Sequence, residues 1–307
     1  MYKIIHRASG DVRASEIKEL RAGSWILVEE TSREELTELA DKLSLDKAVL
    51  LDGLDPYEVP RLEMHEGVGY VFTRYPLASG EEQSTWPILF IISSQYLITI
   101  STRKLAIFDD FLIGKIDYST TERAKLLVQL FSRINREYFS AIQAVSKTVR
   151  ALRVALDKVR DEDIIHFVRS EEVLGDYLSA LSAASAMLSL LLSGKHLELQ
   201  AKDKELVEDT LLAKGQLIEI AQASLKNIGN IRAAYTAVLS QRLNNTIKTL
   251  TVLTVVLNVP VLVASFYGMN VSLPGEGYAH SFALIVSTSL LVSVALLYFM
   301  TKRPSTR

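Results

Sequence analysis

Residues 249–301 read TLTVLTVVLNVPVLVASFYGMNVSLPGEGYAHSFALIVSTSLLVSVALLYFMT. This stretch holds one charged side chain, that of Glu276, although the 307-residue chain carries 34 Lys+Arg and 36 Asp+Glu. Soluble core helices rarely exclude charge from every face. The stretch therefore predicts a membrane-embedded part joined to a charge-rich, water-soluble part.

The membrane-embedded part divides into two apolar runs, 249–267 and 282–300. Each is long enough to cross a hydrocarbon core of ~30 Å, which takes roughly 20 residues of helix. The link 268–281 contains Pro274, Gly275 and Gly277 and is expected to be an external loop. We predict a transmembrane hairpin over 249–303, with a buried soluble hairpin as the alternative.

The basic residues beside the two runs predict the orientation of the hairpin. Two precede the first run and three follow the second, whereas the link has none: Arg242, Lys248, Lys302, Arg303 and Arg307. Basic residues favour the cytoplasmic side, so both termini are expected there. The absence of cysteine agrees with a cytoplasmic body. We expect a multi-pass protein of the cell (plasma or inner) membrane in contact with lipid.

A polar stripe follows the first run. Asn244, Thr251, Asn258 and Ser265 recur every seven residues, with Thr254 beside them, and on a helix they share one face. An amide facing lipid near mid-membrane would cost several kcal/mol without partners. The stripe therefore faces protein, as a contact between packed helices, or the water of a pore. The second run has no comparable stripe, and a pore would require a symmetric oligomer.

The side chains of the two runs limit which ions could cross the membrane along them. Neither contains Asp, Glu or Arg, which argues against a proton relay or a voltage sensor. Pro260 predicts a kink in the first helix. Mg²⁺ gives up its water reluctantly, so neutral amide and hydroxyl oxygens suit the hydrated ion.

Helical patterns dominate from Ser119 onward. A capping box, Ser119-Thr120-Thr121-Glu122, opens a helix that continues to about Val159. A second helix is predicted over Asp161–Ser193, and a third from near Glu198 to Tyr267. About 70 residues of helix span roughly 100 Å, so we predict a bundle and a long helical stalk over 119–248.

Residues 1–118 predict a cytoplasmic α/β domain, although the chain is mainly α overall. Five segments are rich in β-formers: Tyr2–Arg7, Trp25–Glu30, Val68–Tyr75, Ile88–Ile92 and Tyr96–Ile100. A capping box at Ser32–Glu35 opens a helix to about Leu43. No phosphate loop, catalytic triad or histidine pair at ligand spacing is present, so no enzyme and no organic cofactor are expected. A net charge of −2 gives no reason to expect nucleic acid.

One short motif ends the first apolar run, Tyr267-Gly268-Met269-Asn270. Its position before the second of two C-terminal spans resembles the CorA-type magnesium channel family, whose hallmark is this sequence. The approach Asn258–Phe266 is similar too, as is the N-terminal segment with Asp52, Asp55 and Glu58-Val59-Pro60-Arg61-Leu62-Glu63. The resemblance covers nearly the whole chain.

The resemblance implies a homopentamer whose first-span helices surround a central pore for Mg²⁺. Gly268, Met269 and Asn270 would form the outer mouth that holds a hydrated ion. The pore lining would run from Asn244 through Leu250, Thr254 and Asn258, in agreement with the polar stripe. Cytoplasmic Mg²⁺ would also act as a regulatory ion, at sensor positions that match Asp52 and Asp209.

The chain departs from many family members just after the motif. They carry Met-Pro-Glu-Leu, whereas this chain has Ser272-Leu273-Pro274-Gly275-Glu276. Glu276 is a candidate outer-loop acid that would concentrate cations at the mouth.

Two alternatives to Mg²⁺ (and possibly Co²⁺) transport remain at this point. One is a Co²⁺, Ni²⁺ or Zn²⁺ transporter on the same scaffold, because nothing in the residue chemistry excludes these ions. The other is a membrane-anchored coiled-coil scaffold, which would leave a mid-membrane Asn258 without a role.

Overall fold

The structure is a computed structural model that describes residues 2–11, 14–77, 84–153, 161–193, 201–271, 275 and 280–302. The chain forms two compact units, Met1–Arg232 and Ala233–Arg307. The predicted division into 1–118, 119–248 and 249–303 is not tested by this partition and stays a prediction.

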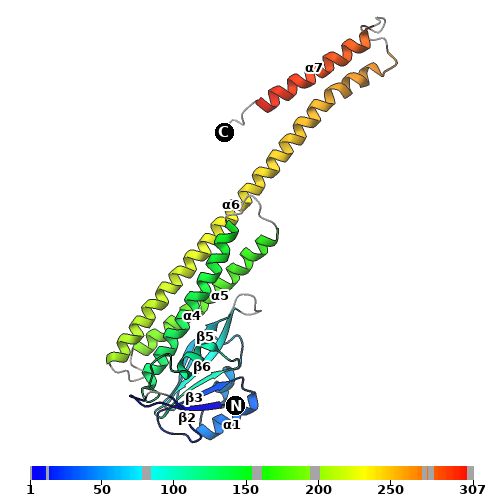
Figure 1. The fold of residues 1–307 in the computed structure, drawn as a ribbon. Coiled ribbons are helices and arrows are strands. Elements are labelled where there is room, and N and C mark those ends of the chain that lie inside the picture. The colour runs from blue at the N-terminus through cyan, green and yellow to red at the C-terminus, as the bar shows by residue number, and fades with distance from the viewer. Residues whose placement is uncertain are drawn as a thin grey trace. The chain divides into compact units, whose positions relative to one another are not determined.

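A seven-stranded mixed sheet organises the first unit (Figure 1). Its order is β2-β1-β3-β7-β6-β5-β4, in which only the β3–β7 pair is parallel. The strands are β1 (Tyr2–His6), β2 (Ser15–Glu16), β3 (Ser24–Glu29), β4 (Arg61–His65), β5 (Val68–Pro76), β6 (Thr85–Ile92) and β7 (Tyr96–Ser101). All five predicted strand segments are confirmed, and the short edge strands β2 and β4 were not predicted.

Both faces of the sheet are buried, because the apolar side chains of its central strands point alternately to one face and to the other. Trp25 and Phe90 point into a core shared with the long helices, whereas Ile26 and Ile91 point into a smaller core on the other face. That second face is covered by α1 (Arg33–Leu43) and α2 (Lys47–Asp52). A short helix, α3 (Ala106–Leu112), joins the larger core. Two faces covered by helices give a three-layer unit.

Three long helices complete the larger core, namely α4 (Arg123–Arg153), α5 (Asp161–Leu192) and the first part of α6 (Ala201–Tyr267). Tyrosines join the helices to the sheet: the Tyr138 hydroxyl donates to the Arg74 carbonyl at 3.2 Å and the Tyr177 hydroxyl to the Leu77 carbonyl at 3.0 Å. The two rings also meet edge to face. These buried polar contacts fix α4 and α5 on the sheet.

Two predicted helix starts have different outcomes. At α1 the capping box is present, since the Ser32 hydroxyl accepts from the Glu35 amide and the Glu35 carboxylate accepts from the Ser32 amide. At α4 the helix begins at Arg123, later than predicted, because Ser119 and Thr120 use their hydroxyls on the backbone of Arg7 instead. A contact between the residues before α4 and the residue that follows β1 therefore replaces the expected cap.

A lysine side chain is fully buried between α4 and α6. The Lys214 ammonium group donates to the Asn135 side-chain oxygen at 2.7 Å, and the Asn135 amide donates to the Thr210 carbonyl at 3.0 Å. Among the described residues no carboxylate pairs with Lys214. Burial therefore lowers the pKa of Lys214 to about 7.

The second unit contains the remainder of α6 and the helix α7 (Ser281–Lys302). Within the described residues, three helices are long and apolar enough to cross a membrane: Ile164–Leu192 of α5, α6 and α7. The apolar window of α5 is 44% buried, compared with 6% and 11% in α6 and α7. Since α5 packs on the sheet and α4, its apolar character belongs to the soluble core.

Candidate functional site

The helix α6 presents two different faces in the second unit. Val252 is buried, and the carbonyl of Val256 accepts a hydrogen bond from the Ser293 hydroxyl of α7. At about 100° per residue, both lie roughly 120° to 160° around the helix from Asn258. The polar stripe therefore points away from the partner helix within the chain. Contact between α6 and α7 does not explain it.

The stripe is exposed along its whole length. Asn244, Leu250, Thr251, Thr254, Asn258 and Ser265 are all exposed in the single chain. The Thr251 and Thr254 hydroxyls donate to the carbonyls four residues earlier, those of Ile247 and Leu250, each at 2.8 Å. Their oxygen lone pairs remain available outward. The amide of Asn258 has no hydrogen-bond partner in the described part of the chain, so it is free to meet water or another copy.

The Tyr-Gly-Met-Asn motif follows the last turn of α6. The Gly268 amide donates to the Ala264 carbonyl at 2.9 Å, and the Met269 amide to the Phe266 carbonyl at 3.2 Å. A Cβ atom at Gly268 would lie 3.2 Å from the Ala264 carbonyl oxygen, which is a tight contact. Gly268 therefore allows the chain to turn closely off the helix. Met269 and Asn270 are both exposed beyond it.

Two serines of α7 were not predicted as functional residues. Ser289 and Ser293 are the buried side chains among the described residues of α7, at 8% and 4% exposure. Small residues four apart let helices approach closely. The second run was predicted to have no stripe comparable to that of the first. The Ser293 hydroxyl contacts α6 by donating to the Val256 carbonyl, whereas the Ser289 hydroxyl donates to the Val286 carbonyl of its own helix.

The two predicted sensor carboxylates lie on different elements of the first unit. The Asp52 carboxylate accepts from the Arg61 guanidinium at 2.8 Å. Arg61 also pairs with Glu58 and Glu63, and its hydrogen bond lowers the pKa of Glu63. Asp209 is exposed on α6. No hydrogen bond or ion pair in the described residues joins Asp52 to Asp209, and within those residues no three acidic or histidine side chains cluster as metal ligands.

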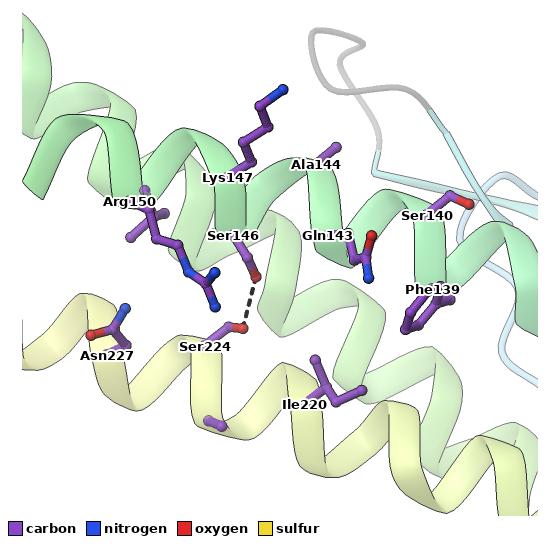
Figure 2. A pocket seen from close by; sticks show the side chains of 12 residues that line it. Phe139, Ser140, Gln143, Ala144, Ser146, Lys147, Arg150, Ile220, Ser224 and Asn227 are labelled. Atoms are coloured by element: carbon purple, nitrogen blue, oxygen red, sulfur yellow. Dashed lines mark hydrogen bonds between the residues drawn. The ribbon is translucent and has the colours of Figure 1, made fainter.

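A groove of about 830 Å³ lies elsewhere, between α4 and α6 of the first unit (Figure 2). Across it the hydroxyl groups of Ser146 and Ser224 form a hydrogen bond of 2.9 Å. Its charged lining residues are Lys147 and Arg150. A basic groove without carboxylates does not suit a divalent cation, so it is not the candidate ion site. Glu276, the predicted outer-loop acid, lies outside the described residues.

Comparisons with known proteins place this chain near metal-ion transporters. The sequence profile of the family described as "CorA-like Mg2+ transporter protein" matches residues 21–303. The cobalt/magnesium transport protein CorA of Methanocaldococcus jannaschii is 25% identical over 293 residues, which cover 89% of this chain and 88% of that protein.

Solved structures share the fold over nearly the full length. The complete structure of the CorA magnesium transporter from the same organism matches with a TM-score of 0.87 at 21% identity, covering 100% of this chain and 99% of that one. The full-length CmaX protein matches with a TM-score of 0.74 at 16% identity, covering 98% and 97%. These matches confirm the predicted fold class, an N-terminal α/β domain followed by long helices and a C-terminal helical pair.

Proposed function

The chain belongs to the family of CorA-like Mg2+ transporter proteins, and we propose that it conducts Mg²⁺ through a pore lined by α6 of several copies. The single observation that carries this proposal is the exposed polar face of α6, turned away from α7. One helix with one polar face cannot enclose water, whereas a ring of copies can. The proposed assembly is a homopentamer in the cell membrane, in contact with lipid and with both termini in the cytoplasm.

The proposed pathway uses the stripe as a neutral, hydrated lining. Rings of Asn258 amides and of Thr251 and Thr254 oxygens offer acceptors to the water around the ion. Mg²⁺ keeps several waters in most sites because dehydration is costly. The driving force is the membrane potential, worth ~4.6 kcal/mol for a divalent ion at ~100 mV. Transport is therefore passive and inward.

The proposed mouth is the turn at Gly268, Met269 and Asn270. We expect Asn270→Ala to reduce Mg²⁺ influx into proteoliposomes roughly tenfold, because each copy loses an amide oxygen that would hold the hydrated ion. Asn227→Ala in the groove of the first unit is a matched control and should leave influx unchanged. Undiminished influx in the Asn270→Ala variant would exclude this role for the mouth.

The proposed gate responds to cytoplasmic Mg²⁺ bound between copies at Asp52 and Asp209. Binding that favours one of two states shifts the equilibrium toward it, so Mg²⁺ would close the pore that supplies it. In this arrangement Asp52 must exchange part of its pairing with Arg61 for the ion. The proposed lining and the proposed gate use different residues, so each can be tested with its own variants.

Removing both sensor carboxylates should leave the channel open. We expect Asp52→Ala/Asp209→Ala to keep its influx within about twofold when millimolar Mg²⁺ is present on the cytoplasmic side, where the unaltered chain closes. Asp41→Ala/Glu208→Ala removes one exposed carboxylate from α1, the helix before α2, and one from α6, and should close normally. A sensor variant that still closes would contradict the assignment of this pair.

The second candidate function is transport of a divalent metal ion other than Mg²⁺. The archaeal relative is named for cobalt as well as magnesium, so we include Co²⁺ as a substrate. Competition between Mg²⁺ and Co²⁺, Ni²⁺ or Zn²⁺ in the same influx assay distinguishes a magnesium channel from a transporter of the other ions. A scaffold that only uses the hairpin as an anchor is not favoured, because the family consists of transporters.

A further inference from the structure

The helix α6 contains a proline in its interior, at position 260. Proline has no amide hydrogen, so the carbonyl four residues earlier loses its normal helical donor. That carbonyl belongs to Val256. Inside a membrane an unpaired carbonyl is costly, because no bulk water replaces the missing donor. The Val256 carbonyl therefore requires another partner.

The partner is on the neighbouring helix. The Ser293 hydroxyl of α7 donates to the Val256 carbonyl at 3.1 Å, across 37 positions of sequence. Serine and threonine hydroxyls in helices usually donate to the carbonyl three or four residues earlier in their own helix. Thr288 and Ser289 of α7 do so, to Leu284 and Val286. Ser293 departs from this pattern at the one carbonyl that Pro260 leaves without its helical donor.

We propose that Ser293 is a positioning residue for the ion pathway, which supplies from α7 the hydrogen bond that Pro260 removes from α6. The bond fixes α6 against α7 at Val256, two residues before Asn258. Ser293 is 4% exposed, so water does not compete for this contact. It holds the rotation of α6 at this level and thereby the direction in which Asn258 points. The effect on transport rests on the proposed function, whereas the hydrogen bond itself does not.

A double-mutant cycle isolates this bond. Pro260→Ala restores an amide hydrogen that can donate to the Val256 carbonyl within α6, so Ser293 should become dispensable in that background. The four proteins are the unaltered chain, Ser293→Ala, Pro260→Ala and the double variant. Ser289→Ala is the matched control, because it removes the other buried hydroxyl of α7, whose bond stays within its own helix. Each is assayed for the melting temperature of the detergent-solubilised full chain and for Mg²⁺ influx into proteoliposomes.

We expect Ser293→Ala to lower the melting temperature by about 2–4 °C and to reduce influx roughly threefold or more, as for the loss of one hydrogen bond between membrane helices. In the Pro260→Ala background both changes should fall below about a third of these values. In the chain that keeps Pro260, Ser289→Ala should change the melting temperature and the influx less than Ser293→Ala does.

Equal effects of Ser293→Ala in both backgrounds, or none in either, would overturn the proposal. If Pro260→Ala does not fold, a Ser289→Ala effect as large as that of Ser293→Ala would also overturn it. If the unaltered chain carries no Mg²⁺, the melting temperatures still decide whether the bond forms, and only the proposed function fails.

Discussion

Asn258→Leu is expected to reduce Mg²⁺ influx about a hundredfold, which corresponds to ~2.7 kcal/mol in the barrier. The substitution replaces one polar ring of the proposed pore by a ring of branched apolar side chains. Hydrophobic constrictions exclude water from a pore, and a hydrated divalent ion cannot cross them without losing its shell. Leucine suits a membrane helix, so the loss of influx should occur without a loss of folding.

The measurement is the initial rate of Mg²⁺ influx into proteoliposomes, with the melting temperature as a check of folding. Asn245→Leu is the matched control. Asn245 lies on the same helix but roughly 140° around it from Asn258, and its side chain accepts a hydrogen bond from Gln241. The control should retain influx within about twofold. Equal losses in both variants would show that the polar face of α6 does not line the pathway.

Lys214→Met is expected to stabilise the chain by about 2 kcal/mol near neutral pH, since a buried charge without a carboxylate partner is replaced by an apolar side chain of similar length. The gain is smaller than the full cost of the buried charge, because the Asn135 oxygen loses its donor. Denaturant unfolding of the full chain measures the change. Lys226→Met, at an exposed position on the same helix, is the matched control and should be nearly neutral.

The pH dependence of this stability has a definite sign. The folded chain holds the Lys214 pKa at about 7, below its ordinary value of 10.5, so the unfolded chain binds more protons between these values. The free energy of unfolding therefore rises with pH across this window, by up to ~1.4 kcal/mol per pH unit, and the full penalty applies below it. The advantage of Lys214→Met should shrink between pH 7 and 10. An advantage that does not change with pH would contradict the lowered pKa of Lys214.

Most of the fold could be predicted from local sequence signals. The five segments rich in β-formers and the capping box at Ser32 depend on residues close in the chain, and the structure contains each of them. The start of α4 was predicted too early for a physical reason. Ser119 and Thr120 bond to the backbone of Arg7, more than a hundred positions away, and no local pattern contains that contact.

The candidate site was predictable only in part for the same reason. The stripe through Asn258 is periodic in one helix and could be recognised from spacing alone. The role of Ser293 depends on the register between two helices, which the sequence does not specify. The sequence contains the residues that make this contact necessary and possible, namely Pro260 in the first span and two serines four apart in the second, but it does not show that they are paired. The pairing of Asp52 with Arg61 likewise required the strand β4, which was not predicted.

We propose that this chain carries Mg²⁺ down the membrane potential through its own pore. The most direct measurement is Mg²⁺ influx into proteoliposomes that contain the unaltered chain, with an inside-negative potential imposed at several values. We expect influx that grows with the potential, at ~2.3 kcal/mol per charge per ~100 mV, and that vanishes in protein-free vesicles. Influx that is absent, or that does not respond to the potential, in vesicles holding the folded oligomer would contradict it.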